Sequence, residues 1–276
     1  MEQIPIGLLL SGLIAGLAYW RQALTLGGMA GAITVGTLVF GFGGWVWALL
    51  LITFFVSSSW LSHYRISDKE EAAEQFAKGS RRDLGQTLAN GGVGAALAFV
   101  FAQYPEPVLF AAFLGVMSSV TADTWATEMG ILSRVPPRLI TTGEPVPPGT
   151  SGGLTRLGTW ASLAGALLIG AVATLVTQIQ SLAHGQAWSL RAVSYPLLAM
   201  AGGMAGSLVD SLLGATVQSI YYCTHCGKET ERAIHRCGHA TELRRGWEWL
   251  NNDVVNLASS LVGGLVAALL AWLLWR

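Results

Sequence analysis

The stretch that decides the fold is "VLFAAFLGVMSSVTADTWATEMG", Val108–Gly130. Its first half is apolar, and together the two halves reach the length of about 20 residues that a helix needs to cross a bilayer. Its second half nevertheless carries Asp123 and Glu128 among several Thr hydroxyls. Charge at bilayer depth costs free energy and is normally kept for a function or a partner. We therefore expect a membrane helix that ends in chemically useful groups.

The composition of the whole chain is that of an integral membrane protein. Of the 276 residues, 52% are hydrophobic and only 12% are charged, whereas soluble domains carry roughly 25% charged residues. The 34 glycines fit the same class, because glycine lets membrane helices approach closely. A formal net charge of zero gives no electrostatic footprint for nucleic acid, so no nucleic-acid partner is expected.

Apolar runs predict an all-α, polytopic transmembrane bundle of seven or eight spans, forming one membrane domain over residues 1–276. The second and fourth runs are short and rich in glycine, so they are expected to be broken or tilted, and the second is alternatively re-entrant. The sequence leaves the oligomeric state open. The expected spans are Ile4–Trp20, Gly28–Phe42, Trp45–Leu61, Asn90–Gln103, Val108–Glu128, Gly158–Gln180, Ala192–Val217 and Asp253–Trp275.

Three polar segments separate these spans: Ser62–Ala89, which we expect to hold an amphipathic or exposed helix, Met129–Leu157 and Gln218–Asn252. Threading the chain through eight spans places all of the 16 Lys and Arg residues on one face except Arg191 and Arg276. The positive-inside rule makes that face cytoplasmic. Longer polar loops on one face are an alternative explanation of the same bias.

Three spans carry an aspartate close to this face: Asp123 in the fifth, Asp210 in the seventh and Asp253 at the start of the eighth. Carboxylates at one depth repel each other unless a cation lies between them, and Mg²⁺ binds such oxygens together with substrate phosphates. The alternative is a separate structural role for each residue, which for Asp253 means capping a helix. Other polar residues near these acids are Glu128, Asn252 and Asn256.

A Gly-rich segment, "PPRLITTGEPVPPGTSGGLTRLGTW" at residues 136–160, follows the fifth span directly. Backbone N–H groups of Gly and Ser can form a concave anion site, and an arginine fork suits phosphate. A plain turn is the alternative. The candidate phosphate-binding residues are Arg138, Thr141, Thr142, Thr150, Ser151, Gly152 and Gly153, together with Arg82 and Asn90 beside the fourth span.

All three cysteines lie in "YYCTHCGKETERAIHRCGHATE", residues 221–242, within the loop 218–252 between the last two spans. A C-x-x-C-G turn followed by a second Cys/His pair predicts a tetrahedral, structural zinc site. We expect Cys223, Cys226, His235 and Cys237 as ligands, with His239 as the alternative to His235 and His225 as a weaker candidate. Chance clustering is the remaining alternative.

The motifs "RRDLGQTLANGG", "ADTWATEMG", "PRLITTGEPVPPGTSGG" and "WLNNDVVN" resemble a widespread family of multispan membrane proteins that includes the chloroplast phytyl-phosphate kinase. The resemblance extends from about Ala15 to Leu265, and the family is distantly similar to CTP-dependent polyprenol kinases. It implies transfer of a phosphoryl group from a nucleoside triphosphate, with CTP favoured, to an isoprenyl monophosphate. The motif positions in this chain are Asn90, Asp123, Glu128, Arg138, Thr150–Gly153, Asp210, Asn252 and Asp253.

On this hypothesis three aspartates, Asp123, Asp210 and Asp253, hold Mg²⁺ at the cytoplasmic border of the membrane. Glu128 assists the metal or orients the acceptor, and Arg138 with the Gly-rich segment binds phosphates. The rival function is an ion-coupled transporter, because broken helices with intramembrane acids also describe carriers. Acids at the bilayer midplane favour transport, and acids at the cytoplasmic end favour the kinase. A scaffold without catalysis is the third possibility.

Overall fold

The computed structural model describes residues 3–69 and 81–276 of the chain. Within these residues, eight helical segments are long and apolar enough to cross a membrane, so all eight expected spans are confirmed as helices. The segment expected to form an amphipathic helix lies largely in 70–80, outside the described residues. The helices are α1 (Gln3–Trp20), α2 (Leu26–Leu38) with the π-helical turn η1 (Val39–Gly43), α3 (Trp45–His63), α5 (Leu84–Gln103), α6 (Pro107–Gly130), α7 (Arg156–Ala183), α9 (Tyr195–Thr216) and α10 (Asn252–Leu274).

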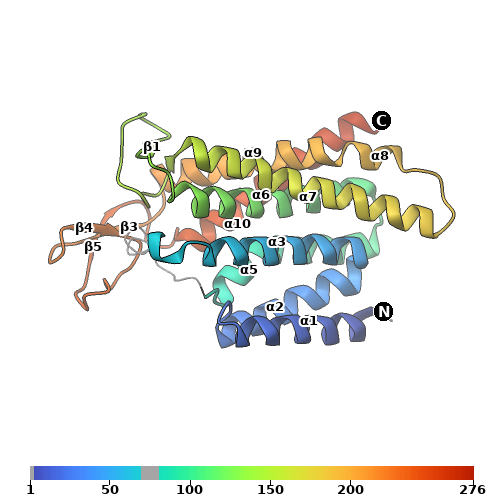
Figure 1. The fold of residues 1–276 in the computed structure, drawn as a ribbon, viewed down its shortest axis with the longest axis horizontal. Coiled ribbons are helices and arrows are strands. Elements are labelled where there is room, and N and C mark those ends of the chain that lie inside the picture. The colour runs from blue at the N-terminus through green and yellow to red at the C-terminus, as the bar shows by residue number, and fades with distance from the viewer. Residues whose placement is uncertain (1–2, 70–80) are drawn as a thin grey trace.

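Successive helices run in opposite directions along the bundle (Figure 1). The connections that contain the β-strands therefore gather at one end, which we call the polar end, and both termini lie at the other end. The second span, Leu26–Gly43, has the length and hydropathy of a membrane-crossing helix, with η1 prolonging α2. The fourth helix begins at Leu84 rather than near Asn90, because Asp83 and Gln86 form a capping box.

Helix α6 is the centre of the bundle and packs against α7, α9 and α10 (Figure 1). Residues 110–122 of α6 are all buried. Glycines make the closest crossing: a Cβ on Gly202 of α9 would lie 2.6 Å from the Gly263 carbonyl oxygen of α10, and Gly115 of α6 meets the same carbonyl. The backbones of α6, α9 and α10 therefore touch, which fixes the positions of the polar groups farther along these helices.

Five short strands lie at the polar end, which the all-α prediction did not include. Strands β1 (Arg138–Leu139) and β2 (Gly153–Leu154) pair antiparallel and close the Gly-rich segment. Strands β3 (Ile220–Cys223), β4 (Lys228–Thr230) and β5 (Glu242–Arg245) form a sheet in the order β4-β3-β5. A three-stranded sheet thus organises the loop 218–252, where the sequence indicated only a metal-binding clip.

Two short helical turns complete the described chain, the 3-10 turn η2 (Ile66–Lys69) after α3 and α8 (Leu190–Val193) before α9. The start of α5 is tied to the connection between α1 and α2. The Thr25 backbone N–H donates to the Arg82 carbonyl at 2.9 Å, and the Arg82 N–H donates to the Ala23 carbonyl at 2.9 Å. Arg82 is therefore held in place by its backbone on both sides.

Candidate functional site

A cavity of about 750 Å³ opens at the polar end, where α6, α9 and α10 meet the three polar segments. This volume lies within the range of small-molecule sites. Its lining joins groups far apart in the sequence: Asp123 and Asp210 from the helices, the Gly loop of residues 149–153, and Glu231 from the loop 218–252. We call it the polar cavity.

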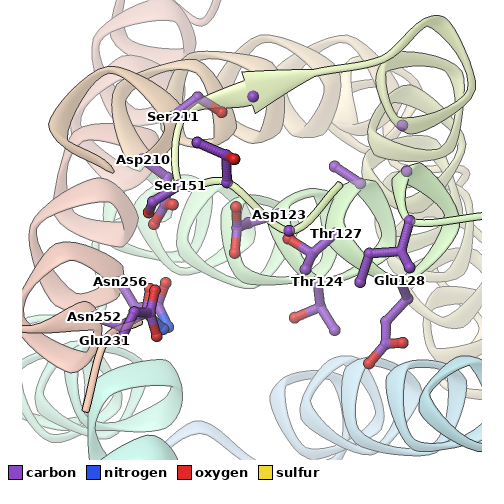
Figure 2. Close-up of a pocket in the computed structure, with 18 of the residues that line it drawn as sticks. Asp123, Thr124, Thr127, Glu128, Ser151, Asp210, Ser211, Glu231, Asn252 and Asn256 are labelled. Atoms are coloured by element: carbon purple, nitrogen blue, oxygen red, sulfur yellow. The ribbon is translucent and has the colours of Figure 1, made fainter. Parts of the chain in front are cut away.

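The carboxyl groups of Asp123 on α6 and Asp210 on α9 face each other across this cavity and interact through their side chains (Figure 2). Ser259 of α10 orients the pair, because its hydroxyl donates to Asp210 Oδ2 at 3.2 Å. Ser259 is itself 2% exposed. Three helices that touch through glycine thus bring two acids and a buried hydroxyl together, and we call Asp123 and Asp210 the carboxylate pair.

The depth of the carboxylate pair follows from the helix bounds. Asp123 lies seven residues before the end of α6 at Gly130, and Asp210 lies six residues before the end of α9 at Thr216. At 1.5 Å per residue these intervals correspond to about 10 Å and 9 Å from the polar end. The opposite ends of the two helices are more than twice as far away. The pair therefore lies in the half of each helix nearer the polar end, about 7 Å from the helix midpoints.

Asp253 also lines the polar cavity, beside Asn252 and Asn256. Within the described part of the chain, groups of three or more Asp, Glu, His or Cys side chains with ligand atoms within 4.8 Å of one another occur only in residues 221–242, which we call the Cys/His segment. The ligand atoms of the three aspartates are therefore not all within this distance of one another. Asp253 does not cap α10 either. The cap is Asn251, whose Oδ1 accepts from the Asp253 and Val254 backbone N–H groups at 3.0 and 3.2 Å.

Glu128 lines the same cavity but lies apart from the carboxylate pair, near α3 (Figure 2). Lys69 donates to Glu128 Oε2 at 2.6 Å and to the Leu61 carbonyl at 2.7 Å, and the Ser62 hydroxyl donates to Glu128 Oε1. The Lys69 side chain is 6% exposed and that of Glu128 is 19% exposed. Both oxygens of this carboxylate are thus engaged by the polar end of α3 and by η2.

The Gly loop closes one side of the polar cavity by packing on α9. Gly152 has φ +84°, and a Cβ there would lie 2.5 Å from Ala215 Cβ, so both its backbone conformation and this contact require glycine. The neighbouring Ser151 hydroxyl donates to Gln218 Oε1 at 2.9 Å, and Gln218 Nε2 donates to Glu231 at 2.8 Å. Gln218, 1% exposed, therefore joins the Gly loop to the loop 218–252.

Some of the residues expected to bind phosphate lie outside the polar cavity. Thr150, Ser151, Gly152 and Gly153 line the polar cavity, as do Arg82 and Asn90. Arg138, Thr141 and Thr142 are exposed and are not among its lining residues. Arg138 instead donates to the Gly143 carbonyl at 2.8 Å and thereby stabilises the turn that β1 and β2 enclose. Among the described residues, the cationic side chains that line the cavity are those of Lys69, Arg82 and Arg236.

Arg82 lies against two aromatic rings of α3. Its guanidinium lies over the rings of Phe54 and Phe55, 5.0 and 5.5 Å from their centroids. The electron-rich faces of the two rings stabilise the positive charge. Burial lowers the pKa of Arg82 to about 10, against the opposing effect of Glu128. Arg82 therefore keeps its positive charge at neutral pH.

The carboxylate pair has the donor chemistry that a hard divalent cation prefers. Two carboxylates that face each other, with Ser207, Ser211 and Asn256 also on the cavity wall, supply oxygen ligands of the kind that Mg²⁺ selects. Mg²⁺ keeps several waters and shares its remaining positions with substrate phosphates. A binding site with two protein carboxylates and space for a ligand fits this ion.

The Cys/His segment gathers the four residues that its spacing predicted. The sulfur and nitrogen atoms of Cys223, Cys226, His235 and Cys237 lie within 4.8 Å of one another, and His225, Cys237 and His239 form a second such group. Hydrogen bonds from the His239 backbone and the His235 side chain lower the pKa of Cys237 to about 5, while the interaction with Cys237 raises the pKa of Cys226 to about 11. Three sulfurs and one imidazole suit zinc, so zinc binding stays a prediction with fitting geometry.

Three residues of the site, Ser62, Gln218 and Glu231, were not predicted from the sequence. Ser62 is hydrogen-bonded to Glu128, 66 residues away, and Gln218 is hydrogen-bonded to Ser151, 67 residues away, and to Glu231. A single sequence gives no signal for such pairings. Gln218 did share a helical stripe with Asp210, which was the available hint.

Comparison with known proteins places these features in a family. The family described as "Integral membrane protein DUF92" matches residues 9–264. Protein PGR of Arabidopsis thaliana is 30% identical over 97% of this chain and 96% of its own length. An uncharacterized membrane protein of Methanocaldococcus jannaschii is 31% identical over 88% of this chain and 84% of its own. Protein VTE6, chloroplastic, of A. thaliana is 24% identical over 90% of this chain and 65% of its own length. No solved structure matches.

Proposed function

This chain belongs to the integral membrane protein family DUF92, and on that premise we propose that it is a membrane phosphotransferase. Its substrates are an isoprenyl monophosphate of phytyl type and a nucleoside triphosphate, with CTP favoured, and its product is the isoprenyl diphosphate. The observation that carries the proposal is the carboxylate pair, Asp123 and Asp210, set about 10 Å inside the polar end, in a cavity that the Gly loop also lines.

Phosphoryl transfer asks the protein mainly for positioning and charge. A phosphate oxygen of the isoprenyl monophosphate attacks the terminal phosphorus of the nucleotide, forming a new P–O bond. The bond from that phosphorus to the bridging oxygen breaks, and the nucleoside diphosphate leaves with the electron pair. Mg²⁺, when bound, would offset the charge of the phosphate oxygens. The reaction consumes no oxidant and needs no covalent enzyme intermediate.

The residues of the polar cavity suit these demands. Asp123 and Asp210 hold the cation, and Ser259 keeps Asp210 oriented by its hydrogen bond. In the Gly loop the Thr150 and Gly153 N–H groups donate to the Pro147 and Thr150 carbonyls. The N–H groups of Gly149, Ser151 and Gly152 are therefore the candidate donors to phosphate oxygens. Lys69, Arg82 and Arg236 line the wall and place positive charge around the phosphates.

The polar cavity supports the kinase, because the carboxylate pair shares it with the Gly loop and three cationic side chains. The depth of the pair, about 7 Å from the helix midpoints, does not separate a kinase from an ion-coupled transporter, whose sites typically lie near the bilayer midplane. The resemblance of the motifs around Asp123 and Gly152 to the family that includes phytyl-phosphate kinase also supports the kinase. We place the polar end in the cytoplasm, where nucleotide is available, because the positive residues concentrate there.

The test uses purified full-length protein in detergent with Mg²⁺ and CTP or ATP labelled at the terminal phosphate. Phytyl monophosphate, geranylgeranyl monophosphate and free phytol are offered as acceptors. We expect label in the diphosphate of an isoprenyl monophosphate and none on the free alcohol. Absence of label from every lipid, combined with ion uptake by proteoliposomes that Asp210→Asn abolishes, would replace this proposal with a transporter.

A further inference from the structure

A second cavity, of about 210 Å³, lies between α1, α2, α3 and α5. Its walls are built from apolar side chains such as Ile14, Val35, Phe40 and Ile52. Apolar cavities of roughly 150 Å³ already take up small apolar molecules. This space, which we call the apolar cavity, is therefore large enough for part of a hydrocarbon chain.

The apolar cavity is elongated along the bundle. The lining residues on α3 run from Trp45, the first residue of that helix, to Phe55, an interval of about 15 Å at 1.5 Å per residue. Helix α3 begins at Trp45 and runs from the end of the bundle that holds the termini to the polar end (Figure 1). A space this long with so small a volume is narrow, which suits a chain rather than a compact ligand.

The two cavities share a wall. Arg82, Gln86 and Asn90 line both of them, at the start of α5. The guanidinium of Arg82 lies over Phe54 and Phe55, two residues that also line the apolar cavity. A cation and two amides thus stand where the narrow apolar space meets the polar cavity, an arrangement that matches an amphiphile with an anionic head.

We propose that the apolar cavity binds the isoprenyl chain of the lipid phosphate substrate, with the phosphate of that lipid beside Arg82, Gln86 and Asn90. The inference rests on the proposed function for the identity of the substrate, and it adds where the chain lies. It also assigns a role to α1 and α2, which lie outside the α6–α10 core and contribute no residue to the polar cavity (Figure 1).

Small residues on α2 keep this space open and provide a clean test. Ala32 lines the apolar cavity, whereas Ala30 on the same helix is exposed and does not. Ala32→Leu fills part of the cavity, and Ala30→Leu makes the identical change on the outer face. Ala48→Leu narrows the cavity from α3 and serves as a second variant if Ala32→Leu is not recovered folded.

The measurement is equilibrium binding of two probes, phytyl monophosphate and short-chain isopentenyl monophosphate, to purified protein without nucleotide. We expect Ala32→Leu to weaken the binding of phytyl monophosphate by about tenfold or more, because each excluded methylene forfeits buried apolar area. Its affinity for isopentenyl monophosphate stays within about twofold of wild type, and Ala30→Leu changes neither.

Equal affinity of wild type, Ala32→Leu and Ala48→Leu for phytyl monophosphate would overturn the chain site. The same variants in the transfer assay separate this inference from the proposed function. Chain-dependent loss of binding without any phosphoryl transfer by wild type retains the chain site and rejects the kinase. Transfer that Ala32→Leu and Ala48→Leu leave unchanged retains the kinase and rejects the chain site.

Discussion

At the scale of single residues, the site depends on how buried charge is compensated. Asp123 and Asp210 face each other, and the Ser259 hydroxyl donates to Asp210, whereas Glu128 accepts from a lysine and a serine. Like charges held together in a low-dielectric region favour the uptake of a cation. The acids of the site therefore differ in their surroundings: Asp123 and Asp210 face each other, and Glu128 is paired with Lys69.

Loss of Lys69 tests its pairing with Glu128. Lys69→Met leaves the partly buried Glu128 without its hydrogen-bonded cation, so we expect the free energy of unfolding to fall by about 2 kcal/mol. The double variant Lys69→Met/Glu128→Gln should recover much of this loss. Thermal or denaturant unfolding in detergent measures both.

The matched control is the pair of Arg65 and Asp68, whose side chains are 57% and 45% exposed. Arg65→Ala should change stability by less than about 1 kcal/mol, as expected for an exposed ion pair. If Lys69→Met proved as mild as Arg65→Ala, the structural role of Glu128 would be incorrect.

Several of the expected site residues line the polar cavity: Thr150–Gly153, Asp123 and Asp210. Their roles in binding and catalysis stay predictions. Arg138 was expected in the same place, but its side chain is used by the turn at Gly143. The Lys69–Glu128 pair spans 59 residues, and nothing in one sequence specifies such a contact.

At the scale of elements, hydropathy located all eight helices because each one is a long apolar run. It misplaced the start of α5, since Gln86, Thr87 and Asn90 interrupt the apolar pattern within the helix. The capping box at Asp83 was the better boundary signal. The short strands escaped because they are two to four residues long and depend on pairing with distant segments.

The crossing of α9 and α10 provides an element-scale prediction. Gly202→Ala places a methyl group 2.6 Å from the Gly263 carbonyl oxygen, so the helices must separate and we expect a loss of about 1–3 kcal/mol of stability. Gly16→Ala on α1, where nothing lies within 4 Å, is the matched control and should be neutral or slightly stabilising. Equal stability of the two variants would mean that α9 and α10 are not in backbone contact.

The Cys/His segment provides a second prediction at the scale of elements. We expect one bound zinc per chain by elemental analysis, lost in Cys223→Ser and in His235→Ala because each removes a ligand of the four-residue set. His239→Ala should retain the metal. The opposite result, retention in His235→Ala and loss in His239→Ala, would assign the site to the alternative histidine.

At the scale of the whole molecule, the alternating helices predict that residues at the polar end and residues in the α7–α8 connection lie on opposite sides of the membrane. His184 is exposed in that connection, while all three cysteines belong to the polar end. In right-side-out vesicles, a membrane-impermeant maleimide should modify His184→Cys and leave wild type unmodified. Strong labelling of wild type from outside would invert the proposed orientation.

The measurement that tests the central claim most directly is the rate of phosphoryl transfer from labelled CTP to phytyl monophosphate by Asp210→Asn. The variant keeps the size of the side chain and removes one charge of the carboxylate pair, so we predict a rate at least about 100-fold below wild type with little change in melting temperature. Glu106→Gln, outside the polar cavity at the start of α6, is the control and should transfer normally. Transfer by folded Asp210→Asn at the wild-type rate would contradict the account.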